Sequence, residues 1–117
     1  MALTEPYEGS LTVSTTELSL VSGTSTLQEV TVDGVYQVML DLSAMANGDA
    51  FEARIYEKVR ASGTKRVIAF YLFTDAQGAD GANQALEPLQ LMHGWDVTLI
   101  KTAGTDRAIG YSIRKAA

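Results

Sequence analysis

Cysteine is absent from this 117-residue chain, and histidine occurs once, at position 93. Without thiols the protein has no disulfide framework, no cysteine-ligated zinc or iron–sulfur centre and no cysteine nucleophile. His93 has no second histidine or cysteine with which to complete a transition-metal site. We therefore expect no metal and no other cofactor, and we expect His93 to have a structural or surface role.

Long apolar runs and basic charge are also scarce. The longest nearly apolar run, Val67 to Phe73, is far shorter than the roughly 20 residues that span a bilayer, and the amino terminus lacks the basic and apolar regions of a secretory signal. Nine Lys and Arg against fourteen Asp and Glu give a net charge of −5, the wrong sign for binding a phosphate backbone. We expect a soluble chain made in the cytoplasm, with neither a membrane nor a nucleic acid as its partner.

Enzyme signatures are missing too. The chain contains no Gly-x-Ser-x-Gly, Gly-x-Gly-x-x-Gly, P-loop or His-Glu-x-x-His motif. Asp75 and Asp80 lack the alternating acidic ligands and terminal Glu of an EF-hand loop. We expect no catalytic activity.

What the chain does have is enough apolar material for one core. With 46% hydrophobic residues we expect a single domain over residues 1–117. Residues 1–28, rich in Ser and Thr, are expected to form an amino-terminal arm or edge strands, and residues 74–84 a long surface loop.

Apolar and polar residues alternate with a period of two in most segments, which is typical of half-buried β-strands. Between these segments, turns are expected to close hairpins at residues 33–34, 61–64 and 102–106. The expected strands cover residues 11–13, 18–20, 29–32, 35–42, 50–60, 65–73, 85–92, 95–101 and 108–114. The prediction is an all-β protein, an antiparallel β-sandwich or jelly-roll-like barrel of about eight short strands.

Residues 50–60 alternate an apolar set, ending at Val59, with a charged set. Glu57 is in phase with the apolar set, which predicts a position at the sheet margin or a paired cation, because a lone buried carboxylate is costly. Pro88 predicts an edge or a bulge in strand 85–92.

Strand 65–73 is apolar on both faces. Ile68, Phe70 and Leu72 lie on one face, and the other face carries Val67, Ala69, Tyr71 and Phe73. Either the monomer covers both faces, or one face meets another subunit. Most aromatic side chains are expected in the core, namely Tyr36, Phe51, Phe70, Tyr71, Phe73, Trp95 and Tyr111, whereas Tyr56 falls on the charged face.

The charged face next to this strand has two interpretations. Most such faces are solvated, with ion pairs of small value. The alternative is docking against an acidic partner surface. The candidate partner-binding residues are Arg54, Tyr56, Lys58, Arg60, Lys65, Arg66, Phe70 and Tyr71.

Three segments resemble small virion structural proteins of tailed bacteriophages. They are Asp33-Gly-Val-Tyr-Gln-Val-Met-Leu-Asp-Leu42, Asn47-Gly-Asp-Ala-Phe-Glu-Ala-Arg-Ile-Tyr-Glu-Lys-Val59 and His93-Gly-Trp-Asp-Val-Thr-Leu-Ile-Lys-Thr-Ala-Gly-Thr-Asp-Arg107. The resemblance implies a particle component without enzymatic activity, made in the host cytoplasm and located in the virion.

The first hypothesis is a capsid decoration or cement protein that binds the major capsid protein where several subunits meet, as a homotrimer. An alternative is a tail or neck component of the same particle. A third hypothesis, from another class, is a carbohydrate-binding β-sandwich in which Trp95 or Tyr56 stacks on a sugar.

Overall fold

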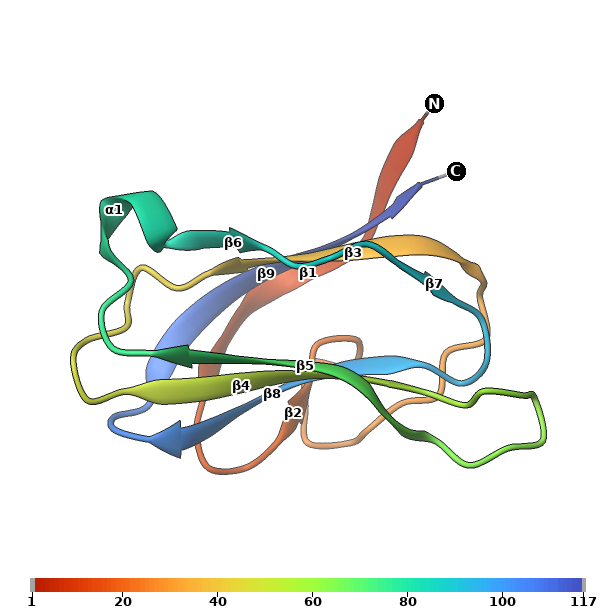
Figure 1. The fold of residues 1–117 in the computed structure, drawn as a ribbon, viewed down its shortest axis with the longest axis horizontal. Coiled ribbons are helices and arrows are strands. Elements are labelled where there is room, and N and C mark those ends of the chain that lie inside the picture. The colour runs from red at the N-terminus through yellow and green to blue at the C-terminus, as the bar shows by residue number, and fades with distance from the viewer. Residues whose placement is uncertain (1, 117) are drawn as a thin grey trace.

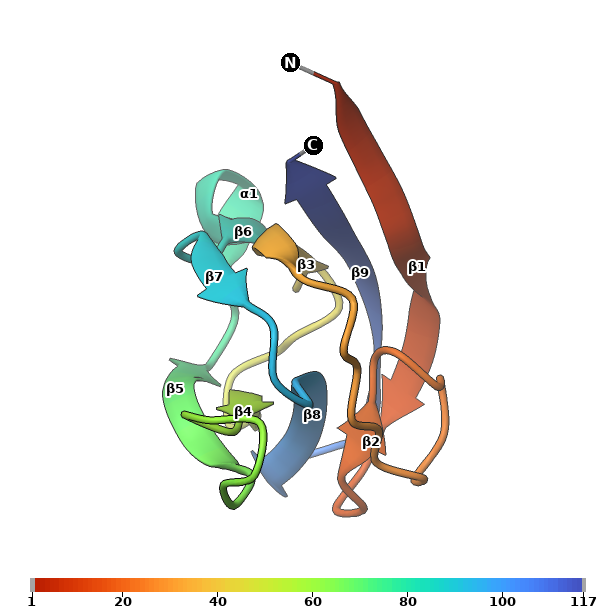
Figure 2. The same cartoon turned by 90° about the vertical axis from the view of Figure 1, so that its right-hand side faces the viewer.

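The computed structural model describes residues 2–116 as two antiparallel β-sheets that face each other (Figure 1). The first sheet has the order β1 (Leu3–Val13), β9 (Arg107–Ala116), β3 (Gly34–Asp41), with the short strands β6 (Asn83–Ala85) and β7 (Leu89–Leu91) both beside β3. The second sheet has the order β2 (Leu18–Ser19), β8 (Asp96–Ala103), β4 (Ala50–Glu57), β5 (Arg66–Thr74). Seen from the end, the two sheets form two layers (Figure 2).

The strand order is that of a jelly roll. β6 and β7 pair with opposite ends of β3, and Pro88 lies in the gap between them, where no ladder donor is needed. If β6 and β7 are counted together as one interrupted strand, the sixth along the chain, each sheet has four strands. Numbered in this way, the first sheet has the order first, eighth, third, sixth, and the second sheet the order second, seventh, fourth, fifth. The fold is therefore the predicted β-sandwich, with jelly-roll connectivity.

The core lies between the sheets, on the faces that the alternation predicts. Tyr36 and Trp95 pack together with ring centroids 4.5 Å apart, and the Trp95 indole nitrogen donates a hydrogen bond to the Val32 carbonyl at 3.2 Å. The largest fully buried apolar side chains are Trp95, Phe51, Leu20, Leu42, Ile55, Leu99, Ile109 and Ile113.

The hairpin predicted at residues 33–34 is wrong, and so is the strand predicted over 29–32. Val30 forms only an isolated bridge with Trp95, and β3 pairs with β9, β6 and β7. The Val32 carbonyl accepts hydrogen bonds from the side chains of Tyr36 and Trp95. The long-range contacts with Trp95 and the local one with Tyr36 hold the segment where it passes from the second sheet to the first.

The hairpin predicted at residues 102–106 is also wrong, because β8 and β9 belong to different sheets. Each is an inner strand with neighbours on both sides, β2 and β4 beside β8 and β1 and β3 beside β9. Neither has a free side for the other, so residues 104–106 cross between the layers. The hairpin predicted at 61–64 is confirmed, since β4 and β5 are antiparallel neighbours.

Three smaller corrections concern the ends of elements. β4 ends at Glu57, so Val59 is 88% exposed and does not belong to the apolar face predicted for it. The segment predicted as a loop over 74–84 contains the short helix α1 (Gly78–Gly81) and the start of β6. β1 spans residues 3–13 and therefore begins well before the strand predicted at 11–13. It is an outer strand of the first sheet, one of the two forms expected for residues 1–28, and its amino-terminal end runs with the end of β9 beyond the rest of the sandwich (Figure 1). Within residues 2–116, no helix is long and apolar enough to cross a membrane.

Candidate functional site

The most distinctive surface is an apolar stripe along the outer side of β5. We use the term stripe for Val67, Ile68, Phe70 and Leu72, whose exposed fractions are 43%, 44%, 66% and 57%. β5 ends the second sheet and has β4 on one side only. Phe70 is therefore exposed, against the expectation that it belongs to the core.

A register shift explains why Val67 joins the stripe. Ile55 of β4 pairs with Ala69, and the next residue of β4, Tyr56, pairs with Val67, so that Ile68 has no partner in β4. This bulge turns Val67 to the outer face, although simple alternation places it inside. Beyond the bulge the alternation holds: Ala69, Tyr71 and Phe73 face the core and are partly buried against it.

A network of charged side chains covers β4 next to the stripe. The Arg54 guanidinium donates a hydrogen bond to Glu52 at 2.9 Å and lies 3.5 Å from a carboxylate oxygen of Glu17. The same Glu17 oxygen accepts hydrogen bonds from the hydroxyls of Tyr56 at 2.6 Å and Thr98 at 2.5 Å. Arg54 and Tyr56 are thus engaged within the chain rather than free for a partner.

The network also shifts the protonation of its members. Burial alone raises the pKa of Glu17, but the hydrogen bonds from Thr98 and Tyr56 and the charge of Arg54 together hold its pKa below the ordinary value. The hydrogen bond to Glu52 raises the pKa of Arg54. Burial raises the pKa of Tyr56. Each of these shifts favours the protonation state that the network needs at neutral pH.

The remaining candidate cations divide into two groups. Lys58 is 2.7 Å from Glu29, and the Lys65 ammonium donates to the Gln28 carbonyl at 3.0 Å and lies over the Tyr56 ring, 5.5 Å from its centroid. Arg60 and Arg66 are exposed, and neither makes an ion pair with any residue from 2 to 116. Of the eight candidate residues, the structure leaves Arg60, Arg66 and Phe70 open on the surface, while Tyr71 faces inward.

The sequence did not reveal Glu17 as a member of the network on β4. It also did not reveal Asp96, which fixes the loop over β8. The buried carboxylate of Asp96 accepts hydrogen bonds from the Ser19 hydroxyl at 2.7 Å and from the Gln28 amide at 2.8 Å. Burial raises its pKa, and these donors oppose that shift. Asp96 therefore fastens the segment between β2 and β3 to the outer face of the second sheet.

Glu57 caps a turn instead of pairing with a cation. One carboxylate oxygen accepts hydrogen bonds from the backbone amides of Met92 at 2.6 Å and His93 at 3.0 Å. The backbone amide of Lys58 donates to the His93 carbonyl at 2.9 Å, so hydrogen bonds in both directions join the end of β4 to this turn. Glu57 lies at the end of β4, which confirms its position at the sheet margin. The bonds to His93 use only its backbone.

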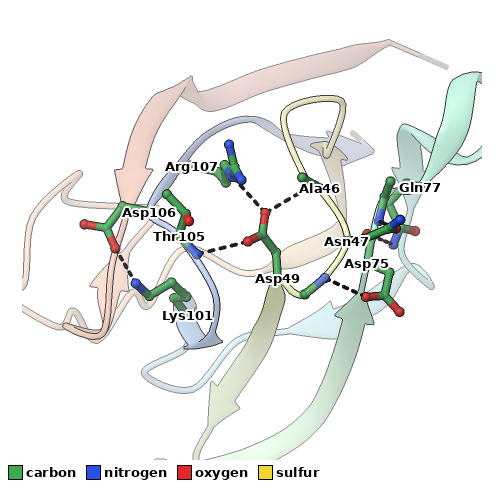
Figure 3. A network of polar contacts seen from close by, with 11 residues as sticks. Ala46, Asn47, Asp49, Asp75, Gln77, Lys101, Thr105, Asp106 and Arg107 are labelled. Atoms are coloured by element: carbon green, nitrogen blue, oxygen red, sulfur yellow. Dashed lines mark hydrogen bonds and ion pairs between the residues drawn. The ribbon is translucent and has the colours of Figure 1, made fainter.

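A second polar network holds the opposite end of the sandwich together (Figure 3). The Asp49 carboxylate accepts hydrogen bonds from the amides of Ala46 at 2.9 Å and Thr105 at 2.9 Å and from Arg107 at 2.7 Å. These hydrogen bonds lower the pKa of Asp49 to about 2, and the two from backbone amides have the largest effect. The network joins the segment before β4 to the crossing between β8 and β9, so its role is structural.

Two further features of the surface bear on ligand binding. A shallow hollow of about 320 Å³ lies on the first sheet, lined by residues that include Asp41, Asn83, Ser112 and Arg114. Ser112 already contacts Glu5, and Arg114 donates to Ser112. Among residues 2–116, no group of three or more His, Cys, Asp or Glu side chains is arranged to hold a metal ion.

The sugar-stacking role suggested for Trp95 is wrong. Its side chain is fully buried between Tyr7 and Tyr36, so no ligand in solvent reaches its ring. Tyr56 is partly buried, and its hydroxyl is bonded to Glu17. Neither ring forms an open platform of the kind that binds sugars.

Neither a scan against protein-family models nor a search of curated proteins finds a match for this chain.

Proposed function

We propose that the protein is a non-enzymatic virion structural protein, a capsid decoration or cement protein that attaches to the assembled head of a tailed bacteriophage. The observation that carries the proposal is the stripe on β5 with the exposed cations Arg60 and Arg66 near it. An open apolar row at a sheet edge is unfavourable in an isolated chain and marks a surface built for contact. A structural component of a particle requires such contacts.

The two parts of this surface have separate roles in the proposal. The stripe serves association between copies of the chain, which joins several weak head contacts into one strong attachment. Arg60, in the turn between β4 and β5, contacts acidic groups of the major capsid protein. The resemblance of residues 33–42, 47–59 and 93–107 to small virion proteins supports this class of partner. The jelly roll adds an analogy at the level of the fold only, since viral capsid proteins, lectins and cupins share it.

Co-sedimentation with empty heads of the phage that encodes the chain tests the proposal. Wild-type protein is expected to pellet with the heads and to be released as salt rises, because exposed charge contacts are screened. Arg60→Glu is expected to weaken binding at least about tenfold, the effect of losing one favourable contact of about 1.4 kcal/mol.

The matched control is Arg114→Glu, which makes the same charge change at an exposed residue of the first sheet and is expected to bind as wild type does. Protein that stays in the supernatant with heads but binds purified tails or necks contradicts the decoration role and supports the tail or neck alternative. Equal weakening by both variants contradicts the docking role of Arg60.

A further inference from the structure

We propose that two copies of the protein pair edge to edge through β5, with the two strands antiparallel and related by a two-fold axis that passes between the two Phe70 residues. The second sheets of the two copies then form one continuous sheet. The inference concerns the isolated protein and does not depend on head binding.

β5 is an open template for another strand. It has a neighbour on one side only, so the polar backbone groups of its free side have no partner in the sheet. Natural proteins protect such edges with charged residues, prolines or bulges. Residues 67–74 contain no charged residue and no proline, and the bulge at Ile68 lies near one end of the strand. The rest of the edge is unprotected.

The strand is complementary to itself when it is reversed. β5 runs from Arg66 to Thr74, so Phe70 is its midpoint. In an antiparallel pair centred there, Phe70 faces its own copy and Ile68 faces Leu72 of the other chain, which doubles the stripe on one face. On the inner face Ala69 is opposite Tyr71, so a small residue faces a large one. Apolar cross-strand pairs of this kind stabilise antiparallel sheets.

Charge favours the same arrangement. Arg66 is the only charged residue of β5, and the antiparallel pair sets it opposite Thr74. The two Arg66 side chains are then eight residues apart along the strand, roughly 26 Å at 3.3 Å per residue. A parallel pair sets them side by side. The neighbouring Arg54 is already neutralised by Glu52 and Glu17, so the pairing brings no unpaired charges together.

These features identify a second copy of the chain as the occupant of the edge. A two-fold contact uses the same patch on both chains and closes after two copies. The structure therefore favours a dimer over the homotrimer expected from the sequence.

The mass of the purified protein in solution is the first test. Light scattering is expected to give twice the 12.6 kDa of one chain for the wild type. Phe70→Asp is expected to give the mass of one chain and to raise the dissociation constant of the dimer by more than about a hundredfold, because it replaces a central aromatic contact with two facing carboxylates. Val59→Asp, at an exposed apolar residue outside the stripe, is the control and is expected to remain dimeric.

Oxidative cross-linking tests the register of the pairing. Because the chain has no native cysteine, only the introduced cysteines can form a disulfide. Directly opposite residues of antiparallel strands lie about 4.5–5.5 Å apart between Cα atoms, which a disulfide spans. Phe70→Cys is expected to form a covalent dimer. Leu72→Cys is expected to form none by itself but to cross-link when mixed with Ile68→Cys. Val59→Cys, off the edge, controls for random collision.

A wild-type mass of one chain at millimolar concentration, or of three chains, overturns the pairing. Cross-linking of Leu72→Cys with itself as fast as Phe70→Cys overturns the register. Failure of head binding with an intact dimer contradicts only the proposed function. Head binding by a monomer contradicts the pairing and the role proposed for the stripe, but not attachment to the head.

Discussion

Replacing Gly104 with Ala tests whether the crossing between β8 and β9 packs closely against Asp49. Gly104 has a φ of +87°, and a Cβ atom there is 2.2 Å from the Asp49 carboxylate and 2.6 Å from the Asp49 Cα. Gly48 offers a matched control, because its φ is +94° and a Cβ atom there meets nothing within 4 Å. The two substitutions share the backbone penalty and differ in the steric one.

The magnitudes follow from this difference. A left-handed backbone costs a residue with a side chain about 1–2 kcal/mol, which is the expected loss for Gly48→Ala. Gly104→Ala adds the cost of overpacking against Asp49, about 1–3 kcal/mol. For a domain of this size, each kcal/mol lowers the melting temperature by about 4 °C.

Equilibrium unfolding in urea, followed by tryptophan fluorescence, measures both variants. Trp95 is the only tryptophan and is fully buried, so its emission reports loss of the core. Gly104→Ala is expected to be the less stable of the two by at least about 1 kcal/mol. Equal losses of stability for Gly104→Ala and Gly48→Ala, measured on monomeric protein, refute the close contact with Asp49.

Three further outcomes are expected. Glu57→Ala is expected to lower the free energy of unfolding by about 1–3 kcal/mol, because two backbone amides lose a charged acceptor, while Glu87→Ala at an exposed site changes it by less than about 0.5 kcal/mol in the same urea titration. Asp49 has a folded pKa of about 2 against roughly 3.9 in the unfolded chain, so its stabilisation is fully present above the unfolded pKa and lost as the pH falls through the folded one. Melting curves from pH 7 to pH 2 are therefore expected to show the gap between wild type and Asp49→Asn closing below about pH 4, and a constant gap contradicts the role of the carboxylate. Tyr71→Asp is expected to destabilise the monomer by about 2–4 kcal/mol because Tyr71 packs on the core, whereas Phe70→Asp costs no more than about 1 kcal/mol, and calorimetry that finds the reverse order contradicts the assignment of faces.

The alternation of the sequence predicted which side of most strands faces the core. In β3, β4 and β8, the residues predicted to share an apolar face are buried, because a period of two follows directly from strand geometry. Val67 is the exception. Its outward orientation results from the bulge in the pairing with β4, and the local sequence of β5 does not reveal that bulge. Val59 was misplaced because the strand ends two residues earlier than the alternation does.

The pairing of strands was harder to predict than their existence. Asp33-Gly34 and the Gly104 segment have the residues of tight turns, and tight turns serve hairpins and crossings between sheets equally well. Which one forms depends on distant partners, such as Trp95 for the first segment and Asp49 for the second. Those partners are not visible in the local sequence.

The candidate site was predicted in part for the same reason. Phe70 was identified because strand 65–73 has too much apolar surface for a single face. The opposite orientation of Tyr71 follows from alternation, but its burial depends on the β4 partner. Arg54 pairs with Glu17, which lies 37 positions away in the chain. The local sequence does not show this pairing, so Arg54 was predicted to be available to a partner.

Electron cryo-microscopy of virions of the phage that encodes the chain tests the proposed decoration role most directly. If the proposal is right, density for this jelly roll is expected on the outer surface of the head, repeated with the capsid lattice, with the turn between β4 and β5 against the shell and β5 of neighbouring copies paired. Virions that carry the protein only in a ring at the neck or along the tail, or that lack it, would contradict the proposal.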